Sequence, residues 1–119
     1  MEILYYIMEN PPKEASVELA DNRISLYSAQ YGNCFVTGEK LEIGEMEVHH
    51  KLPKELGGTD EYRNLVWVTY NVHKLIHVTE QATIERYLTT VNPNKEMFEK
   101  LNKLRTQAGN CVIDVERIA

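Results

Sequence analysis

All four histidines of this chain fall between residues 49 and 77, and this concentration limits its possible folds more than any other feature. His49 and His50 are adjacent at the end of a β-favouring run, and a loop with a Gly-Gly pair follows them. His73 and His77 lie in a later segment whose apolar positions have helical spacing. The window predicts, in order, a strand over 46–50, a loop, a strand over 64–68 and a helix over 70–77.

The segments on either side of this window predict further helices and short strands. Residues 1–8 contain enough aromatic and β-branched side chains for a strand, although a helix is not excluded. An Asn-Pro-Pro break follows, so we expect residues 1–20 to be an N-terminal extension or linker and residues 21–119 to be the folded domain. Caps predict three helices: from Asp21 or Asn22 to about Tyr31, from Thr79 to about Val91, and from Asn94 to about Ala108. The remaining expected strands are residues 34–36, before a tight turn, and residues 111–115.

Composition and charge limit the class of protein. The 119 residues suffice for one domain, and a hydrophobic fraction of 43% with a charged fraction of 26% is ordinary for a soluble globular protein. No apolar run approaches the ~20 residues of a membrane helix, and the N-terminal segment is unlike a signal peptide. We therefore expect a cytoplasmic protein that does not contact a membrane. The net charge of −5 argues against tight unaided binding to nucleic acid, which relies on a basic face.

The spacing of the histidines allows a metal site. His73 and His77 are four residues apart, so they project from one face of a helix and can bind a transition ion together. His49 and His50 are consecutive on a strand, so their side chains point to opposite faces. One of them can complete a three-histidine site while the other faces the substrate as a base. In the alternative without a metal, His49 is hydrogen-bonded in the core beside a solvent-facing His50, and the helix pair lies on the surface.

Asn64 lies between the two histidine pairs. Its amide can hydrogen-bond loop backbone and orient the histidine strand, or it can be an ordinary turn residue. The whole series resembles the H-N-H endonuclease motif with its ββα-metal fold. Over about residues 20–110 the chain resembles more narrowly the C-terminal endonuclease domain of bacterial group II intron reverse transcriptase/maturases. The stretches that carry this likeness include residues 26–30, 34–38, 49–53, 57–60, 72–77, 83–84, 87–88, 101–105 and 109–110.

The resemblance implies a role for each of these residues. His50 would be the general base that takes a proton from water, and Asn64 would hold the loop that orients it. His49, His73 and His77 would bind one divalent ion against the scissile phosphate. The implied substrate is double-stranded DNA. The implied partner is an intron RNA–protein particle or an upstream reverse transcriptase region, which would choose the target.

The chain departs from the family pattern in its cysteines. Many relatives have two Cys-x-x-Cys knuckles that bind a structural zinc, whereas here Cys34 is followed by Thr37, and the downstream positions are Thr69 and Val72. One cysteine cannot form such a site, so we expect no structural zinc. We also expect Cys34 to pack as a small apolar residue, and Cys34 and Cys111 to be reduced thiols, although a disulfide is possible in principle.

The identity of the catalytic ion is also open. Family members often use magnesium, which prefers oxygen ligands, whereas three imidazoles prefer ions such as zinc, nickel or cobalt. The candidates are therefore Mg²⁺ or a transition metal such as Zn²⁺, Ni²⁺ or Mn²⁺.

With this resemblance, we expect a small α+β domain with a ββα-metal core and flanking helices that nicks DNA by phosphodiester hydrolysis. Two alternatives belong to other classes of protein. A catalytically silent module of the same fold would bind metal or nucleic acid. An RNA-binding accessory of an intron particle would use clustered aromatic side chains, which are few and scattered here.

Overall fold

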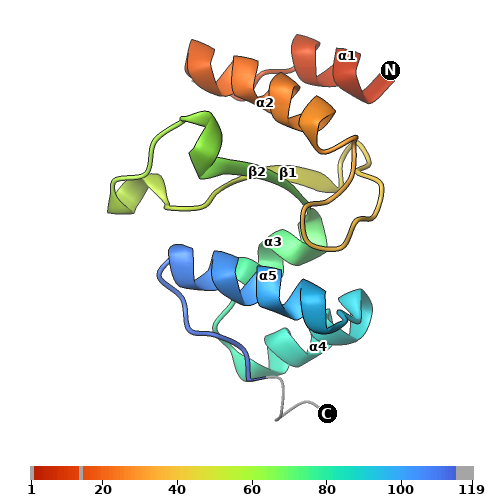
Figure 1. Cartoon of the computed structure of the whole chain (residues 1–119), viewed down its shortest axis with the longest axis vertical. Helices are drawn as coiled ribbons and strands as arrows, with labels where there is room; N and C mark the ends of the chain where they lie inside the picture. The colour runs from red at the N-terminus through yellow and green to blue at the C-terminus, as the bar shows by residue number, and fades with distance from the viewer. Residues whose placement is uncertain (1, 14, 115–119) are drawn as a thin grey trace.

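Helices and a two-stranded sheet stack in three layers along the long axis of the molecule (Figure 1). The computed structural model describes residues 2–13 and 15–114. The described elements, in chain order, are α1 (Glu2–Glu9), α2 (Val17–Ala29), β1 (Met46–His50), the short 3₁₀ helices η1 (Lys54–Leu56) and η2 (Tyr62–Asn64), β2 (Leu65–Thr69), α3 (Tyr70–His77), α4 (Gln81–Val91) and α5 (Lys95–Gln107). Helices α1 and α2 form one outer layer, and α3 to α5 form the other. The expected α+β class is confirmed.

The register of the sheet decides which side chains face each helical layer. Strands β1 and β2 are antiparallel, with His49 opposite Val66 and His50 opposite Leu65. Side chains alternate along each strand, and cross-strand partners share a face. The indole of Trp67 donates a hydrogen bond to the carbonyl oxygen of Arg23 in α2 (2.8 Å), so His50, Leu65 and Trp67 are on the α2 face. His49 and Val66 are then on the α3 face, and the pleat separates the two histidines as expected.

A buried arginine fastens α3 to α5. Arg105 is only 2% exposed, and its guanidinium donates hydrogen bonds to the carbonyl oxygens of Leu75, Val78 and Cys111. Carbonyl groups at the end of a helix lack partners within the helix, and the arginine supplies hydrogen-bond donors there. This contact fixes the end of α3, which carries His77, against α5.

The N-terminal segment differs from the prediction. Residues 1–8 were expected as a strand with a helix as the alternative, and the described part forms helix α1, with Ile7 buried and Ile3 partly buried against the core. These isoleucines are four residues apart, which suits one helix face. Helix α2 begins at Val17 rather than at Asp21 or Asn22, because the Ser16 hydroxyl caps it by accepting a hydrogen bond from the Leu19 amide (2.9 Å). It ends at Ala29. The proposed division at residue 20 stays a prediction, and α2 runs across that position.

Two expected strands are wrong within the described residues. Residues 34–36 form a tight turn, closed by a hydrogen bond from the Gly38 amide to the Cys34 carbonyl (2.9 Å), with a single bridge pairing Asn33 and Lys40. Residues 111–114 are irregular because Asn102 already holds the Ile113 amide and carbonyl through its side chain; Val115 lies outside the described residues. The boundaries of β1 and α3 are confirmed, as is the Asn94 cap of α5. Strand β2 starts one residue later than expected, and α4 is preceded by Glu80 rather than Thr79 at the capping position.

The two cysteines are free and far from equivalent. Cys34 is 3% exposed and packs in the hydrophobic core, as expected, whereas Cys111 is exposed. Among the described helices, none has the length and apolar character needed to span a membrane.

Candidate metal centre

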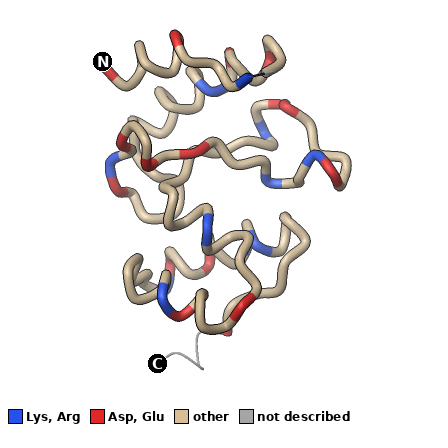
Figure 2. The backbone as a smooth tube through the Cα atoms, turned by 180° about the vertical axis from the view of Figure 1, so that it is seen from behind, with Lys and Arg blue, Asp and Glu red and all other residues tan. Residues whose placement is uncertain are grey.

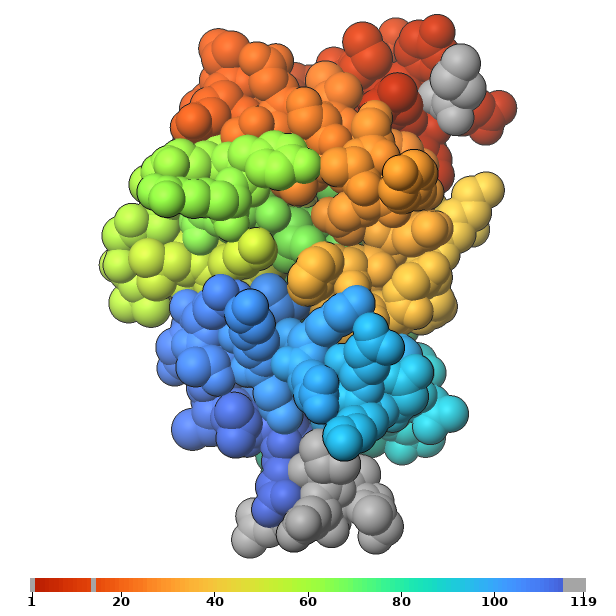
Figure 3. Space-filling model, in the orientation of Figure 1, coloured from red at the N-terminus to blue at the C-terminus, as the bar shows by residue number. Residues whose placement is uncertain are grey.

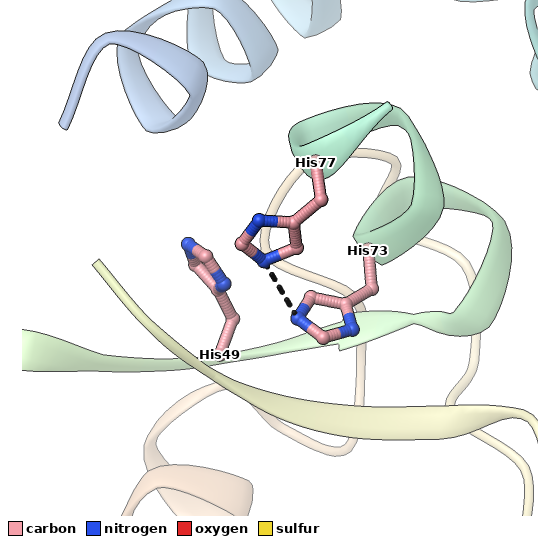
Figure 4. A group of neighbouring side chains, drawn as sticks. All are labelled: His49, His73 and His77. Atoms are coloured by element: carbon pink, nitrogen blue, oxygen red, sulfur yellow. Dashed lines mark hydrogen bonds between the residues drawn. The ribbon is translucent and has the colours of Figure 1, made fainter. Parts of the chain in front are cut away.

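Three of the four histidines meet between the sheet and α3 (Figure 4). His49 comes from β1, and His73 and His77 come from successive turns of α3. One ring nitrogen of each lies within 4.8 Å of the other two. The ring centroid of His49 is 5.2 Å from those of His73 and His77. The predicted convergence of these three residues is confirmed, and the group can hold a metal ion.

The amphipathic pattern of α3 aims its histidines at the sheet. Val72, Leu75 and Ile76 are each fully buried, and they fix the rotation of the helix about its axis. The helix starts directly after β2, where the Thr69 hydroxyl caps it. With this rotation fixed, His73 and His77 occupy the flank of α3 nearest β1.

Burial favours the neutral form of two of these histidines. His49 is 1% exposed, and desolvation, with the neighbouring His73 and His77, lowers its pKa to about 3. Desolvation, followed by the proximity of His73, also lowers the pKa of His77. Because a metal ion binds the neutral imidazole, both shifts favour metal binding at neutral pH.

The histidines fit a transition ion. Nε2 of His49 is buried and has no hydrogen-bond partner among the described residues, which is costly for a polar atom unless a ligand satisfies it. Nε2 of His73 and Nε2 of His77 are 3.2 Å apart, a separation suited to two ligands at ~2.0–2.1 Å from one zinc ion. The alternative in which His49 is a hydrogen-bonded core residue does not account for this unpartnered nitrogen.

A carboxylate that the sequence reasoning missed supports the group. Glu47 precedes His49 by two residues, so it lies on the same face of β1, and its Oε2 accepts a hydrogen bond from Nδ1 of His73. With the hydrogen on Nδ1, Nε2 of His73 carries the lone pair; it lies 3.2 Å from Nε2 of His77, a contact drawn dashed in Figure 4, and it can serve as a metal ligand. Ligand histidines usually bind a carboxylate in this way, which fixes the ring and its tautomer. The period-two spacing from His49 was the one sequence feature that pointed to Glu47.

Replacing this carboxylate tests its role. Glu47→Gln keeps the shape but loses the charge, so we expect roughly 10–100-fold weaker metal affinity. Glu45→Gln makes the same charge change just before β1 and is the matched control. Calorimetric titration with zinc would measure both. Equal affinities for the two variants would show that Glu47 does not support the site.

His50 lies on the other face of β1. Its Nε2 is 2.8 Å from Oδ1 of Asp60, and its side chain is 22% exposed. The structure therefore places the predicted base apart from the three predicted ligands, at the end of the same strand. Asp60 received no role from the sequence, because nothing in a Gly-Gly-Thr-Asp turn shows which residue its carboxylate will meet.

Asn64 holds the loop that follows His50. Its side-chain oxygen accepts a hydrogen bond from the Leu52 amide (2.9 Å), and its Nδ2 donates to the carbonyls of Leu52 (3.1 Å) and Thr59 (2.8 Å). The expected bonding of this amide to loop backbone is confirmed. Gly58 is required in the same loop because a Cβ atom there would lie 1.7 Å from the Leu52 carbonyl oxygen.

The surface is not that of a strongly basic protein. Figure 2 shows basic and acidic positions interspersed along the backbone. The loop over residues 51–64 lies at one edge of the molecule in the space-filling view (Figure 3). Its basic residues are Lys51, Lys54 and Arg63.

Comparisons with protein families, with curated proteins and with solved structures find no match to this chain.

Proposed function

We propose that this chain is a divalent-metal-dependent DNA endonuclease of the H-N-H type, with β1, β2 and α3 as its ββα-metal core. The observation that carries the proposal is the convergence of His49, His73 and His77 in a strand–loop–strand–helix unit. Two further observations support metal binding by this unit: the buried, unpartnered nitrogen of His49 and the contact of the Glu47 carboxylate with His73.

In this proposal the chain's own residues divide the work of hydrolysis. His50 takes a proton from water, whose oxygen forms a bond to phosphorus while the bond from phosphorus to the 3′ oxygen breaks. The leaving oxygen takes a proton from solvent. Asn64 holds the loop beside His50 through its three hydrogen bonds to Leu52 and Thr59. A divalent ion, when bound by the three histidines, would stabilise the negative charge that develops on the phosphate and the 3′ oxygen.

The donor set favours some ions over others. Three imidazoles suit zinc, nickel or cobalt, whereas magnesium prefers oxygen ligands and retains its waters. We therefore expect zinc or nickel to bind more tightly than manganese, and magnesium most weakly. Tight binding and fast hydrolysis need not coincide, so each ion has to be compared in both measurements.

The substrate is double-stranded DNA, bound with the help of a partner. The net charge of −5 makes strong independent binding unfavourable, because phosphate neutralisation supplies much of the affinity for DNA. Lys51, Lys54 and Arg63 can contact phosphates locally. An upstream reverse transcriptase region or an intron RNA–protein particle would supply the remaining affinity and the choice of target.

A second candidate is a module of the same fold that binds metal or nucleic acid without catalysis. The position of His50 favours it, because its Nε2 already contacts Asp60 and its side chain leaves β1 on the face opposite the three histidines. The two candidates share the metal site and differ in whether His50 reaches a phosphate at the strand end.

Nicking of supercoiled plasmid tests the proposal. Wild-type protein with Mg²⁺, Mn²⁺, Zn²⁺, Ni²⁺ or Co²⁺ should convert plasmid to the open circle, and a chelator should stop the reaction. The double variant His73→Ala/His77→Ala should neither take up the ion nor nick, because one histidine cannot hold the ion alone. Metal uptake by the wild type without nicking under any ion would favour the silent module.

A further inference from the structure

Asp60 ties α2 and β1 to the loop that connects β1 with β2. Its side chain is 9% exposed. Oδ1 contacts Nε2 of His50 (2.8 Å), Oδ2 accepts from the Ser16 hydroxyl (2.7 Å), and the Lys54 ammonium is 3.1 Å from both oxygens. The Asp60 carbonyl accepts from the Asn22 side chain (2.8 Å). A single carboxylate thus meets the N-terminus of α2 and the last residue of β1.

The hydrogen bonds define the charge of this carboxylate. The contact with His50, assisted by Ser16 and Lys54, lowers the pKa of Asp60 to about 2 although burial opposes it. An ionised carboxylate only accepts hydrogen bonds. Nε2 of His50 must therefore carry the hydrogen in this contact. In the neutral imidazole, the lone pair is then on Nδ1.

We propose that Asp60 is a positioning residue for His50: it fixes the orientation of the ring and the Nε2–H tautomer, and thereby makes Nδ1 the basic atom. The role of His50 as a base rests on the proposed function, whereas its tautomer is a property of the folded chain. In serine hydrolases, a carboxylate behind a histidine acts in the same way, since it orients the ring and stabilises the imidazolium that forms. Here the carboxylate holds the opposite ring nitrogen.

The tautomer can be read without any substrate. Two-bond ¹⁵N–¹H correlation spectra of the metal-free protein at neutral pH distinguish a protonated Nε2 from a protonated Nδ1. We expect His50 of the wild type to be the Nε2–H tautomer. Asp60→Asn introduces an amide that can also donate, so we expect a mixture of tautomers or a shift to Nδ1–H. Asp60→Glu keeps the acceptor charge and should retain Nε2–H.

Ser16→Ala is the matched control. This variant removes the hydrogen bond from Ser16 to Asp60, which at 2.7 Å is almost as long as the 2.8 Å contact between His50 and Asp60. It also removes the cap of α2, but it leaves the contact between Asp60 and His50 intact. We expect a lower melting temperature with an unchanged His50 tautomer. A wild-type spectrum with Nδ1–H, or a folded Asp60→Asn protein with an unchanged tautomer, would overturn the proposal. A wild-type spectrum with Nδ1–H overturns the proposal even where a variant does not fold.

Nicking adds a second measurement. Asp60→Asn should reduce the nicking rate roughly 10–100-fold at unchanged zinc affinity, and Asp60→Glu should recover part of it. If the wild type nicks DNA and Asp60→Asn nicks at the same rate, the positioning role of Asp60 is excluded, whereas the endonuclease function is supported. If the spectra are as expected but the protein never nicks DNA, the endonuclease function is excluded, and the control of the His50 tautomer by Asp60 still holds.

Discussion

Replacing His50 with alanine should lower the rate of plasmid nicking by roughly 10²–10⁴-fold while leaving metal affinity nearly unchanged. The reason is the pleat of β1, which directs His50 toward α2 and Asp60, away from the three histidines on the α3 face. Removing its imidazole therefore takes away a base without taking away a ligand. The measurement is the single-turnover nicking rate, with zinc affinity from calorimetry beside it.

His49→Ala is the matched comparison, because it removes the neighbouring imidazole from the same strand. This variant should weaken metal binding first, and added metal should restore part of its activity. The reverse outcome, in which His50→Ala loses the ion and His49→Ala keeps it, would exchange the two roles. Undiminished nicking by both variants would exclude the proposed H-N-H mechanism.

The metal-free protein should lose stability steeply in mild acid. The pKa of His49 is lowered to about 3 by burial, whereas an unfolded histidine titrates near 6.5. Between these values the unfolded chain binds a proton that His49 in the folded chain does not bind, so the free energy of unfolding falls as pH falls. At 1.36 kcal/mol per pH unit, the loss from His49 alone between pH 6.5 and pH 4 is about 3 kcal/mol. His77, whose pKa is lowered as well, adds to it.

Urea unfolding in the presence of a chelator, at steps from pH 7 to pH 4, would measure this loss. His49→Leu keeps a buried side chain of similar size that cannot be protonated, so its stability should fall much less over the same range. The carboxyl of Asp60 does not interfere, because its stabilising contribution is lost only as pH falls from about 4 toward its pKa of about 2. Parallel curves for the wild type and His49→Leu would contradict the burial of a neutral His49.

The sequence predicted the elements in which local pattern and tertiary packing agree. Helix α3 has apolar residues at helical spacing, and α5 starts at an asparagine cap, so both were predicted correctly. Helix α1 was misread because aromatic and β-branched residues favour strands in general, whereas packing of Ile7 against α2 decides the outcome here. The start of α2 was wrong because Ser16, Asp21 and Asn22 all suit a capping position, and the contact of Ser16 with Asp60 exists only in the folded chain.

The histidine group followed from the four-residue spacing of His73 and His77 on α3 and from the alternation of side chains along β1, which separates the adjacent His49 and His50. The same alternation puts Glu47 on the face of His49, but the contact partners of Glu47 and Asp60 did not follow from it. Glu47 meets a partner 26 residues away, and Asp60 meets Ser16 across 44 residues. Such contacts depend on how the loop after β1 folds back, and the hydrogen bonds of Asn64 that shape this loop are visible only in three dimensions.

Because His49 and His50 lie on opposite faces of β1, their orientation depends on whether a change in strand length is odd or even. A single-residue insertion or deletion in the strand before His49 would turn every following side chain to the other face, so His49 would point toward α2 and His50 toward α3. Adding or removing two residues together would keep each histidine on its present face of the sheet. Ahead of His49, this strand is therefore expected to change its length in steps of two residues unless a β-bulge absorbs the extra residue.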